Sequence, residues 1–197
     1  MRVRLFGTEV YISFLFAAVV TVLLATDRTG MIVPSLFAII MHEIGHLFCM
    51  WALDCAPKRV KLIPASVQIT SSFTKGYKND IIIAVCGPLV NFLLFFTLYF
   101  NYLAFKNKIT LCYALINLVI GLFNSLPVKG LDGGTVLFSV LVKNIDYNKS
   151  VLILKGITVA VALTVVVIAV WLTLKGKINI SLYIIGIYLF IMSILKM

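Results

Sequence analysis

The chain has 197 residues, of which 62% are hydrophobic and 12% charged, and its mean hydropathy is +1.11. These values exclude an ordinary soluble domain and are typical of a protein that crosses a membrane several times. The net charge of +10 comes from basic residues at the ends of apolar blocks, where they anchor membrane spans, so no nucleic acid partner is expected. We therefore predict an all-α polytopic membrane protein with one integral-membrane domain over residues 1–197.

About six apolar segments predict transmembrane helices, the first being a retained helix and not a cleaved signal peptide. They cover residues 10–26, 31–53, 80–105, 109–142, 151–174 and 178–195. The fourth is too long for one helix and contains Pro127, Gly130 and Gly133-Gly134. We expect it to be broken, because Pro and Gly interrupt helices at membrane depth where the break lines a cavity or is covered by protein.

One long connection runs from Asp54 to Asp80. Residues 59–63 and 66–70 are rich in β-branched side chains and flank Pro64-Ala65. This pattern predicts a short β-hairpin at the membrane surface, between spans two and three. A solvated loop is the alternative.

The basic residues favour one orientation of the spans. The N-terminus, the 54–79 loop, the region around 143–155 and the C-terminus carry 2, 5, 3 and 1 Lys or Arg, in total 11, against 5 on the opposite side. Because cytoplasmic loops are enriched in Lys and Arg, we expect both termini to lie in the cytoplasm and the two histidines to fall in the cytoplasmic half of the second span.

The chain's only two histidines lie in one pentapeptide, His42-Glu43-Ile44-Gly45-His46, inside the second span. Histidines four residues apart share one face of a helix and can bind one Zn²⁺, while the adjacent Glu43 can take a proton from water. Imidazoles and a carboxylate are costly inside hydrocarbon and mark functional sites. The pattern predicts an intramembrane zinc site with Glu43 as general base.

A catalytic zinc site normally has a third protein ligand. The other carboxylates are at span ends or in loops, except for Asp132, which lies in the break of the fourth span. We predict Asp132 as the third ligand; the alternative is a turn or helix-capping aspartate.

Cys49 follows His46 by three residues, but a ligand set on one helix strains a tetrahedral site, so Cys49 is interpreted as a core thiol. The scattered cysteines do not indicate a disulfide framework.

Two further polar insertions accompany these residues. Gly87, Pro88 and Asn91 in the third span are expected to support helix packing, as Pro127 supports the break in the fourth. Asn124 precedes that break. It can reach the reaction centre and stabilise an oxyanion, or it can stabilise the break itself.

Three motifs together resemble the site-2 protease family of intramembrane zinc metalloproteases. They are His42-Glu43-x-x-His46, Gly87-Pro88-x-x-Asn91, and Asn124-x-x-Pro127 with Leu131-Asp132-Gly133, in order across residues 31–142. The span arrangement is most similar to the sporulation subgroup that processes the pro-sigma-K factor, without the CBS domain that its members often carry. The resemblance implies a zinc metalloendopeptidase in which His42, His46 and Asp132 hold one Zn²⁺, Glu43 activates water and Asn124 assists substrate or transition state.

The expected activity is hydrolysis of a peptide bond in a membrane-associated protein, such as a transcription factor precursor, with membrane proteins as candidate regulators and a bacterial cell membrane as the location. A divalent-metal transporter with an intramembrane His, Glu and Asp site is the alternative, although transporters commonly show paired broken helices and this chain shows one break. A catalytically idle scaffold that retains zinc is the third possibility.

Overall fold

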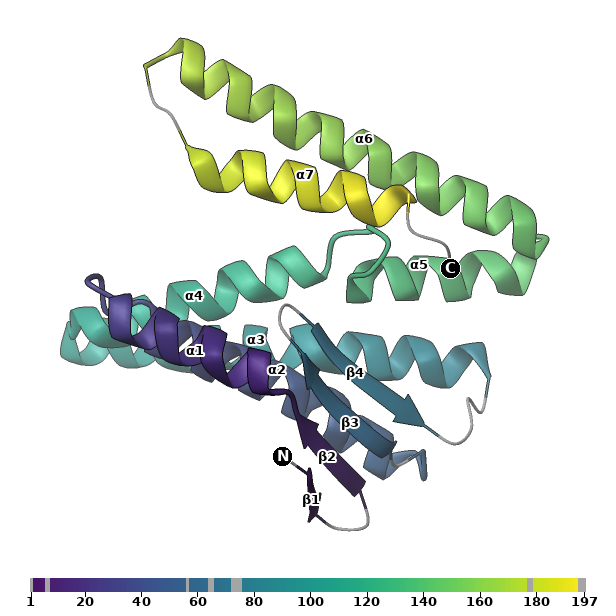
Figure 1. Ribbon diagram of the computed structural model, residues 1–197, viewed down its shortest axis with the longest axis horizontal. Helices are drawn as coiled ribbons and strands as arrows, with labels where there is room; N and C mark the ends of the chain where they lie inside the picture. Colours follow the sequence, from purple (N-terminus) through teal and green to yellow (C-terminus); the bar gives the residue numbers. More distant parts are fainter. Residues whose placement is uncertain are drawn as a thin grey trace. The chain divides into compact units, whose positions relative to one another are not determined.

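The computed structural model describes residues 2–5, 8–55, 57–63, 66–71, 76–176 and 179–194. Its elements fall into two compact units, residues 1–123 and 124–197, which are described separately (Figure 1). The first unit contains β1 (Arg2–Leu5), β2 (Thr8–Ile12), α1 (Phe14–Thr26), α2 (Ile32–Ala52), β3 (Pro57–Ile63), β4 (Ser66–Ser71), α3 (Tyr77–Phe105) and α4 (Lys108–Asn124), whose last residue begins the second unit. The second unit continues with α5 (Asp132–Asn144), α6 (Tyr147–Leu174) and α7 (Ile180–Ile194).

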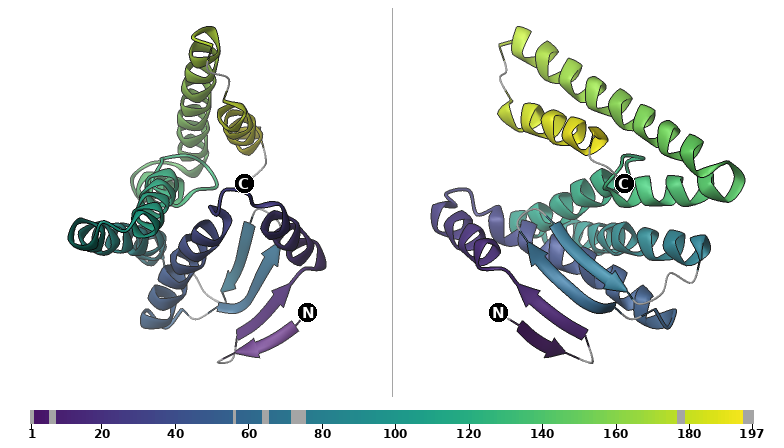
Figure 2. Two further views of the ribbon diagram at one scale, coloured as in Figure 1. Left: turned by 90° about the vertical axis from the view of Figure 1, so that its left-hand side faces the viewer. Right: turned by 45° about the vertical axis from the view of Figure 1, so that its right-hand side comes forward.

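The strands of the first unit form one sheet in the order β1-β2-β3-β4 (Figure 2). β1 and β2 pair antiparallel, as do β3 and β4, while β2 and β3 are parallel. Glu9 of β2 lies opposite Arg59 of β3, and their side chains form an ion pair of 3.2 Å. The outer strands of this described sheet are therefore β1 and β4.

The parallel pairing of β2 with β3 constrains the two helices between them. Parallel neighbours need a crossover connection, and here α1 and α2 supply it. α1 leads away from the end of β2, and α2 leads back to the start of β3 (Figure 1). The four strands thus form one sheet although two helices separate β2 from β3 in the sequence.

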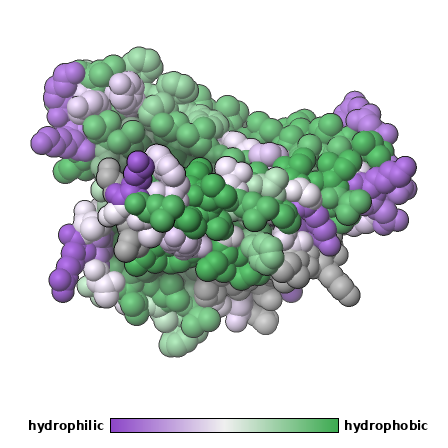
Figure 3. Space-filling model, turned by 90° about the horizontal axis from the view of Figure 1, so that it is seen from above, coloured by the Kyte–Doolittle hydropathy of each residue, from purple (hydrophilic) through white to green (hydrophobic). Residues whose placement is uncertain are grey.

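Several helix interfaces contain fully buried small residues, alongside buried Leu154 and Leu189, while many large apolar residues face outward. Ala38 and Ala114 in the first unit and Ala169 in the second are fully buried, whereas Trp51 and Phe100 are 71% and 65% exposed. Apolar side chains cover much of the face in Figure 3. Small residues let helices approach in lipid, where large apolar side chains need no cover, so this burial is that of an integral membrane protein.

Among the described residues, α2, α3 and α6 are long and apolar enough to cross a bilayer, and α1, α4 and α7 are shorter apolar helices. The fourth predicted span is two helices, α4 and α5, separated by residues 125–131. The sheet departs from the all-α expectation. β1 was not predicted, and neither was β2, whose Val10, Tyr11 and Ile12 are apolar and continue the hydrophobic run of α1 in the sequence.

The turn before α2 depends on one carboxylate. Asp27 accepts hydrogen bonds from the backbone N–H groups of Ile32, Thr29 and Gly30, each at 2.9 Å, and from the Thr29 hydroxyl at 2.8 Å. The Ile32 N–H makes the largest contribution to lowering the pKa of Asp27 to about 2, and these bonds together outweigh the opposing desolvation.

We predict that Asp27→Asn lowers the thermal unfolding temperature in detergent at pH 7, because an amide is a weaker acceptor for these donors. Because the folded pKa is below the unfolded value of 3.8, this stabilisation is complete above that value and is lost as the pH falls through about 2. The difference between wild type and variant should therefore shrink between pH 5 and pH 2. A difference that stays constant with pH would contradict the role of the charge.

Candidate metal centre

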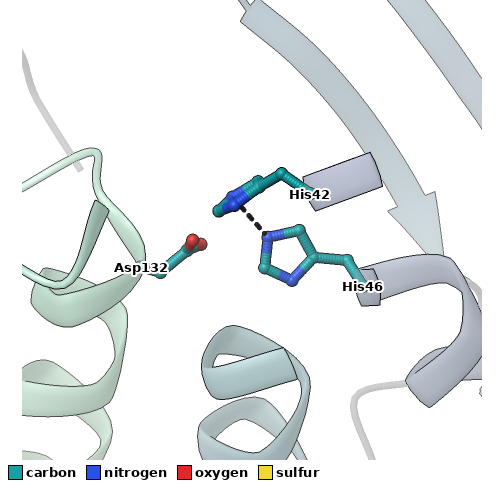
Figure 4. Close-up of side chains that lie close together, drawn as sticks. All are labelled: His42, His46 and Asp132. Carbon is teal, nitrogen blue, oxygen red and sulfur yellow. Dashed lines mark hydrogen bonds between the residues drawn. The ribbon is translucent and has the colours of Figure 1, made fainter. Parts of the chain in front are cut away.

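His42 and His46 are one helical turn apart on α2 and are both buried, with 5% and 8% of their surface exposed. Their rings are nearly perpendicular, at 85°, and the two Nε2 atoms are 3.1 Å apart (Figure 4). The spacing seen in the sequence thus brings the two imidazoles together as a pair.

Hydrogen bonds at the far side of each ring define which nitrogen carries the proton. His46 Nδ1 lies 2.8 Å from the Ile83 carbonyl oxygen, which can only accept, so Nδ1–H donates. His42 Nδ1 lies 2.6 Å from Asn91 Oδ1. Because the Asn91 amide nitrogen donates to the carbonyl of Ala38 at 3.0 Å, its oxygen faces His42, and this Nδ1–H donates as well.

With both Nδ1 atoms donating to protein acceptors, the Nε2 atoms are the positions through which a neutral imidazole pair would bind a shared metal ion. Two nitrogens bound at about 2.0–2.1 Å to one tetrahedral Zn²⁺ are about 3.3–3.4 Å apart. The separation of 3.1 Å is close to this value. The donor set and its tautomers therefore fit zinc.

Two glycines allow α2 and α3 to approach closely and leave room for the imidazole rings. A Cβ on Gly87 of α3 would lie 2.5 Å from His46 Cε1 and 2.8 Å from His42 Cε1. A Cβ on Gly45 of α2 would lie 2.7 Å from the carbonyl oxygen of Cys86. Real side chains do not tolerate such distances, so each helix needs a glycine where the other passes.

The third-span motif contributes directly to the histidine pair and not only to helix packing. Gly87 forms one wall of the imidazole site, and Asn91 bonds His42. Pro88 lies inside α3 and has no N–H to donate to the Ala84 carbonyl, four residues earlier in the helix.

The expectation of a core thiol at Cys49 is wrong in this structure. Cys49 and Cys86 form a disulfide between α2 and α3, with their Cα atoms 6.5 Å apart. The two residues are 37 positions apart in the sequence, without a motif that pairs them. Their proximity follows from the packing of Gly45 against Cys86, which no spacing rule reveals.

In the second unit, Asp132 is the first residue of α5 and half-buried. A helix N-terminus favours a carboxylate through its dipole and unpaired N–H groups. The preceding turn has Leu131 N–H donating to the Val128 carbonyl at 3.1 Å, with Gly130 at a φ of +88°. That left-handed position in the turn favours glycine.

The glycine pair after Asp132 fits the same loop. A Cβ on Gly133 would lie 2.5 Å from the Leu126 carbonyl oxygen, and one on Gly134 would lie 2.5 Å from the Val128 carbonyl carbon. The first turn of α5 can therefore pack under the loop backbone only without side chains at these two positions. Thr158 of α6 accepts the Lys129 backbone N–H at 3.0 Å and tethers the loop.

The structure also places the remaining predicted site residues. His42 and His46 lie on α2 of the first unit, and Asp132 begins α5 of the second unit. Glu43 follows His42 on α2 and is half-buried. Asn124 is the last residue of α4 and half-buried, while Pro127 lies in the loop after it and is exposed.

Sequence reasoning missed Asn117. It is fully buried on α4, and its Oδ1 accepts from the Asn91 amide at 2.9 Å. An amide in the middle of an apolar span is costly without a partner, and that signal could have identified it.

We predict that Gly87→Ala lowers zinc binding at least about tenfold, because the added methyl group must displace the imidazoles from their position. Zinc content of the purified protein after dialysis is the measurement. Gly156→Ala on α6 is the matched control, since nothing lies within 4 Å of a Cβ there. Equal zinc content in the two variants would contradict the packing argument.

Comparison with known proteins places these features in context. No protein-family model matches the chain. The zinc metalloprotease MJ0392 of Methanocaldococcus jannaschii is 28% identical over 166 residues, covering 79% of this chain and 48% of that protein. Stage IV sporulation protein FB of Bacillus subtilis is 26% identical over 135 residues, covering 64% and 46%. The chain thus spans about half the length of these curated relatives.

The solved structure of the site-2 protease from Methanocaldococcus jannaschii superposes with a TM-score of 0.69 at 20% identity, covering 100% of this chain and 97% of that one. Similarity at this level shows a shared fold. The sequence relatives and the shared fold agree with the three motifs, and they confirm the resemblance of this chain to the site-2 protease family.

Proposed function

We propose that the chain is an intramembrane zinc metalloendopeptidase that cleaves a membrane-associated protein. The observation that carries the proposal is the pair of buried imidazoles whose Nδ1 atoms both bond protein acceptors and whose Nε2 atoms lie 3.1 Å apart, a separation that one metal ion can bridge. The relative named as a zinc metalloprotease supports the same chemistry. His42, His46 and Asp132 would hold one zinc ion per chain.

Two residues of the chain have separate roles in the proposed peptide hydrolysis, one in proton transfer and one in hydrogen bonding to the carbonyl oxygen. In such a site zinc supplies Lewis acidity toward a carbonyl oxygen and a lowered pKa for water. Glu43 accepts the proton of the attacking water and delivers it to the leaving amine, which requires a carboxylate beside the metal ligands. The Asn124 amide donates a hydrogen bond to the oxygen that becomes negative as the carbonyl is attacked.

The substrate must present an extended backbone, because a helix hides its peptide bonds in internal hydrogen bonds. β4 is an outer strand of the sheet, and an outer strand can pair with an added strand. We infer that the unwound substrate segment pairs with β4. β3 is already paired with β2 on one side and β4 on the other, so strand addition is to be tested in β4.

The likeness to stage IV sporulation protein FB favours a precursor protein of sporulation, such as a transcription factor precursor, as the substrate. The same likeness to a Bacillus subtilis protein favours a bacterial cell membrane, and the distribution of basic residues favours an orientation with both termini and the site toward the cytoplasm. Membrane proteins that hold the enzyme inactive until the signal arrives would be its regulators.

Glu43→Gln should abolish cleavage of a co-expressed membrane substrate, with a loss of about 10²–10⁴-fold in rate, and should retain zinc. The glutamine keeps the size of the side chain but cannot accept the proton. Glu9→Gln, in β2, is the matched control and should cleave normally. Full cleavage by Glu43→Gln would remove Glu43 as the base, and metal flux without proteolysis in wild type would indicate a transporter.

Proline in β4 tests the strand pairing. Successive N–H groups of a strand point to opposite sides, so one of Val67→Pro and Gln68→Pro removes an outward donor while the other removes a donor that faces β3. We expect the variant without the outward donor to lose cleavage and keep its zinc. Val3→Pro in β1, the opposite outer strand, is the control. Normal cleavage by both β4 variants would contradict pairing at this edge.

A further inference from the structure

Two buried amides connect α4 to His42. Asn117 of α4 and Asn91 of α3 are both 0% exposed. The Asn117 amide nitrogen donates to the Tyr113 carbonyl at 2.9 Å, and its oxygen accepts from Asn91 Nδ2 at 2.9 Å. Asn91 Oδ1 then accepts from His42 Nδ1 at 2.6 Å. We call Tyr113 O, Asn117, Asn91 and His42 the amide relay.

The amide relay has a direction. The Tyr113 carbonyl only accepts, so the nitrogen of Asn117 must face it and the oxygen of Asn117 must face Asn91. This oxygen, with the Ala38 carbonyl, accepts both hydrogens of the Asn91 amide. Asn91 can then offer His42 only its oxygen. Reversing the Asn117 amide would set two donors against each other.

Packing alone does not require an amide at position 117. Gly121 sits one turn further along α4, where a Cβ would lie 3.2 Å from the Asn91 Cβ, so a glycine already permits the approach of α3 and α4. An apolar residue at position 117 would fill the space without desolvating a polar group. The amide of Asn117 is needed because it orients the amide of Asn91.

We propose that Asn117 is a positioning residue that acts through Asn91 on His42 and sets the affinity of the site for zinc. Asn117 orients Asn91, and Asn91 holds His42 with its proton on Nδ1 and its lone pair on Nε2. A partner that accepts from the far nitrogen of a metal-binding histidine fixes the ring and raises its basicity, and its loss weakens metal binding. The inference rests on the proposed zinc site and extends it to a third helix.

The test is a double-mutant cycle on the zinc dissociation constant of the full chain in detergent. Asn117→Leu should weaken zinc binding by about 10–100-fold, although the substitution acts on His42 only through Asn91. Because Asn117 acts through Asn91, Asn91→Ala should weaken binding at least as much, and the double variant no further than Asn91→Ala alone. Ser150→Ala on α6, a buried hydroxyl that bonds the Asp146 carbonyl, should bind as wild type does. Asn117→Ala is the second variant if leucine prevents folding.

A second readout separates positioning from a general loosening of the helices. The chain has two histidines, so ¹⁵N-labelled histidine gives one Nδ1–H signal for each zinc-bound ring. Asn117→Leu should shift the His42 signal and speed its exchange with solvent. The His46 signal, held by the Ile83 carbonyl, should stay unchanged and serve as the internal reference.

The outcomes distinguish this inference from the proposed function. Wild-type affinity in the Asn117 variants, additive effects in the cycle, or equal changes in both histidine signals would overturn the amide relay while leaving the zinc site in place. A wild-type protein that binds no zinc would overturn the proposed function itself.

Discussion

The close approach of α2 and α3 is the constraint on which the histidine pair depends. Gly45 and Gly87 let the two backbones pass where any side chain would collide, and the imidazoles occupy the space that Gly87 leaves open. The same approach brings the Ile83 carbonyl and the Asn91 amide within hydrogen-bond distance of the rings. Without it the histidines would share a helix face but would lack the partners that place their protons.

Buried polar groups in an apolar helix bundle are tolerated only when each has a partner. The histidine Nδ1–H groups and the Asn91 and Asn117 amides meet this condition through carbonyls of three helices, at Ala38, Ile83 and Tyr113. These carbonyl oxygens lie within helices, where each accepts a backbone hydrogen bond, so the polar side chains bond to the second lone pair of each oxygen. The cost of the polar groups is thereby offset by bonds that also fix the direction of every donor.

The local part of this arrangement could be predicted from the sequence and the long-range part could not. The i, i+4 spacing fixes which face His42 and His46 share, and the Pro and Gly residues of the fourth span predict its division into α4 and α5. The Cys49–Cys86 disulfide and the bond from Asn117 to Asn91 join residues 37 and 26 positions apart. The hydrophobic periodicity of the sequence does not predict such pairings, because they depend on which helices pack together. β1 and β2 escaped prediction for a different reason: in a membrane protein, apolar residues of a strand and of the following span form one run.

Glycine serves one physical purpose in both halves of the chain. On α2 and α3 it admits imidazole rings between two helices, and in α5 Gly133 and Gly134 admit the carbonyls of the preceding loop, so that Asp132 begins the helix directly beneath that loop. In each case the functional side chain sits next to a position where a methyl group would collide with backbone or ring atoms. A zinc site needs ligands held in a fixed geometry. Glycines beside the ligands let backbone atoms pack directly against them and restrict their movement. The motif glycines are therefore as much a part of the site's geometry as the residues that would bind the metal.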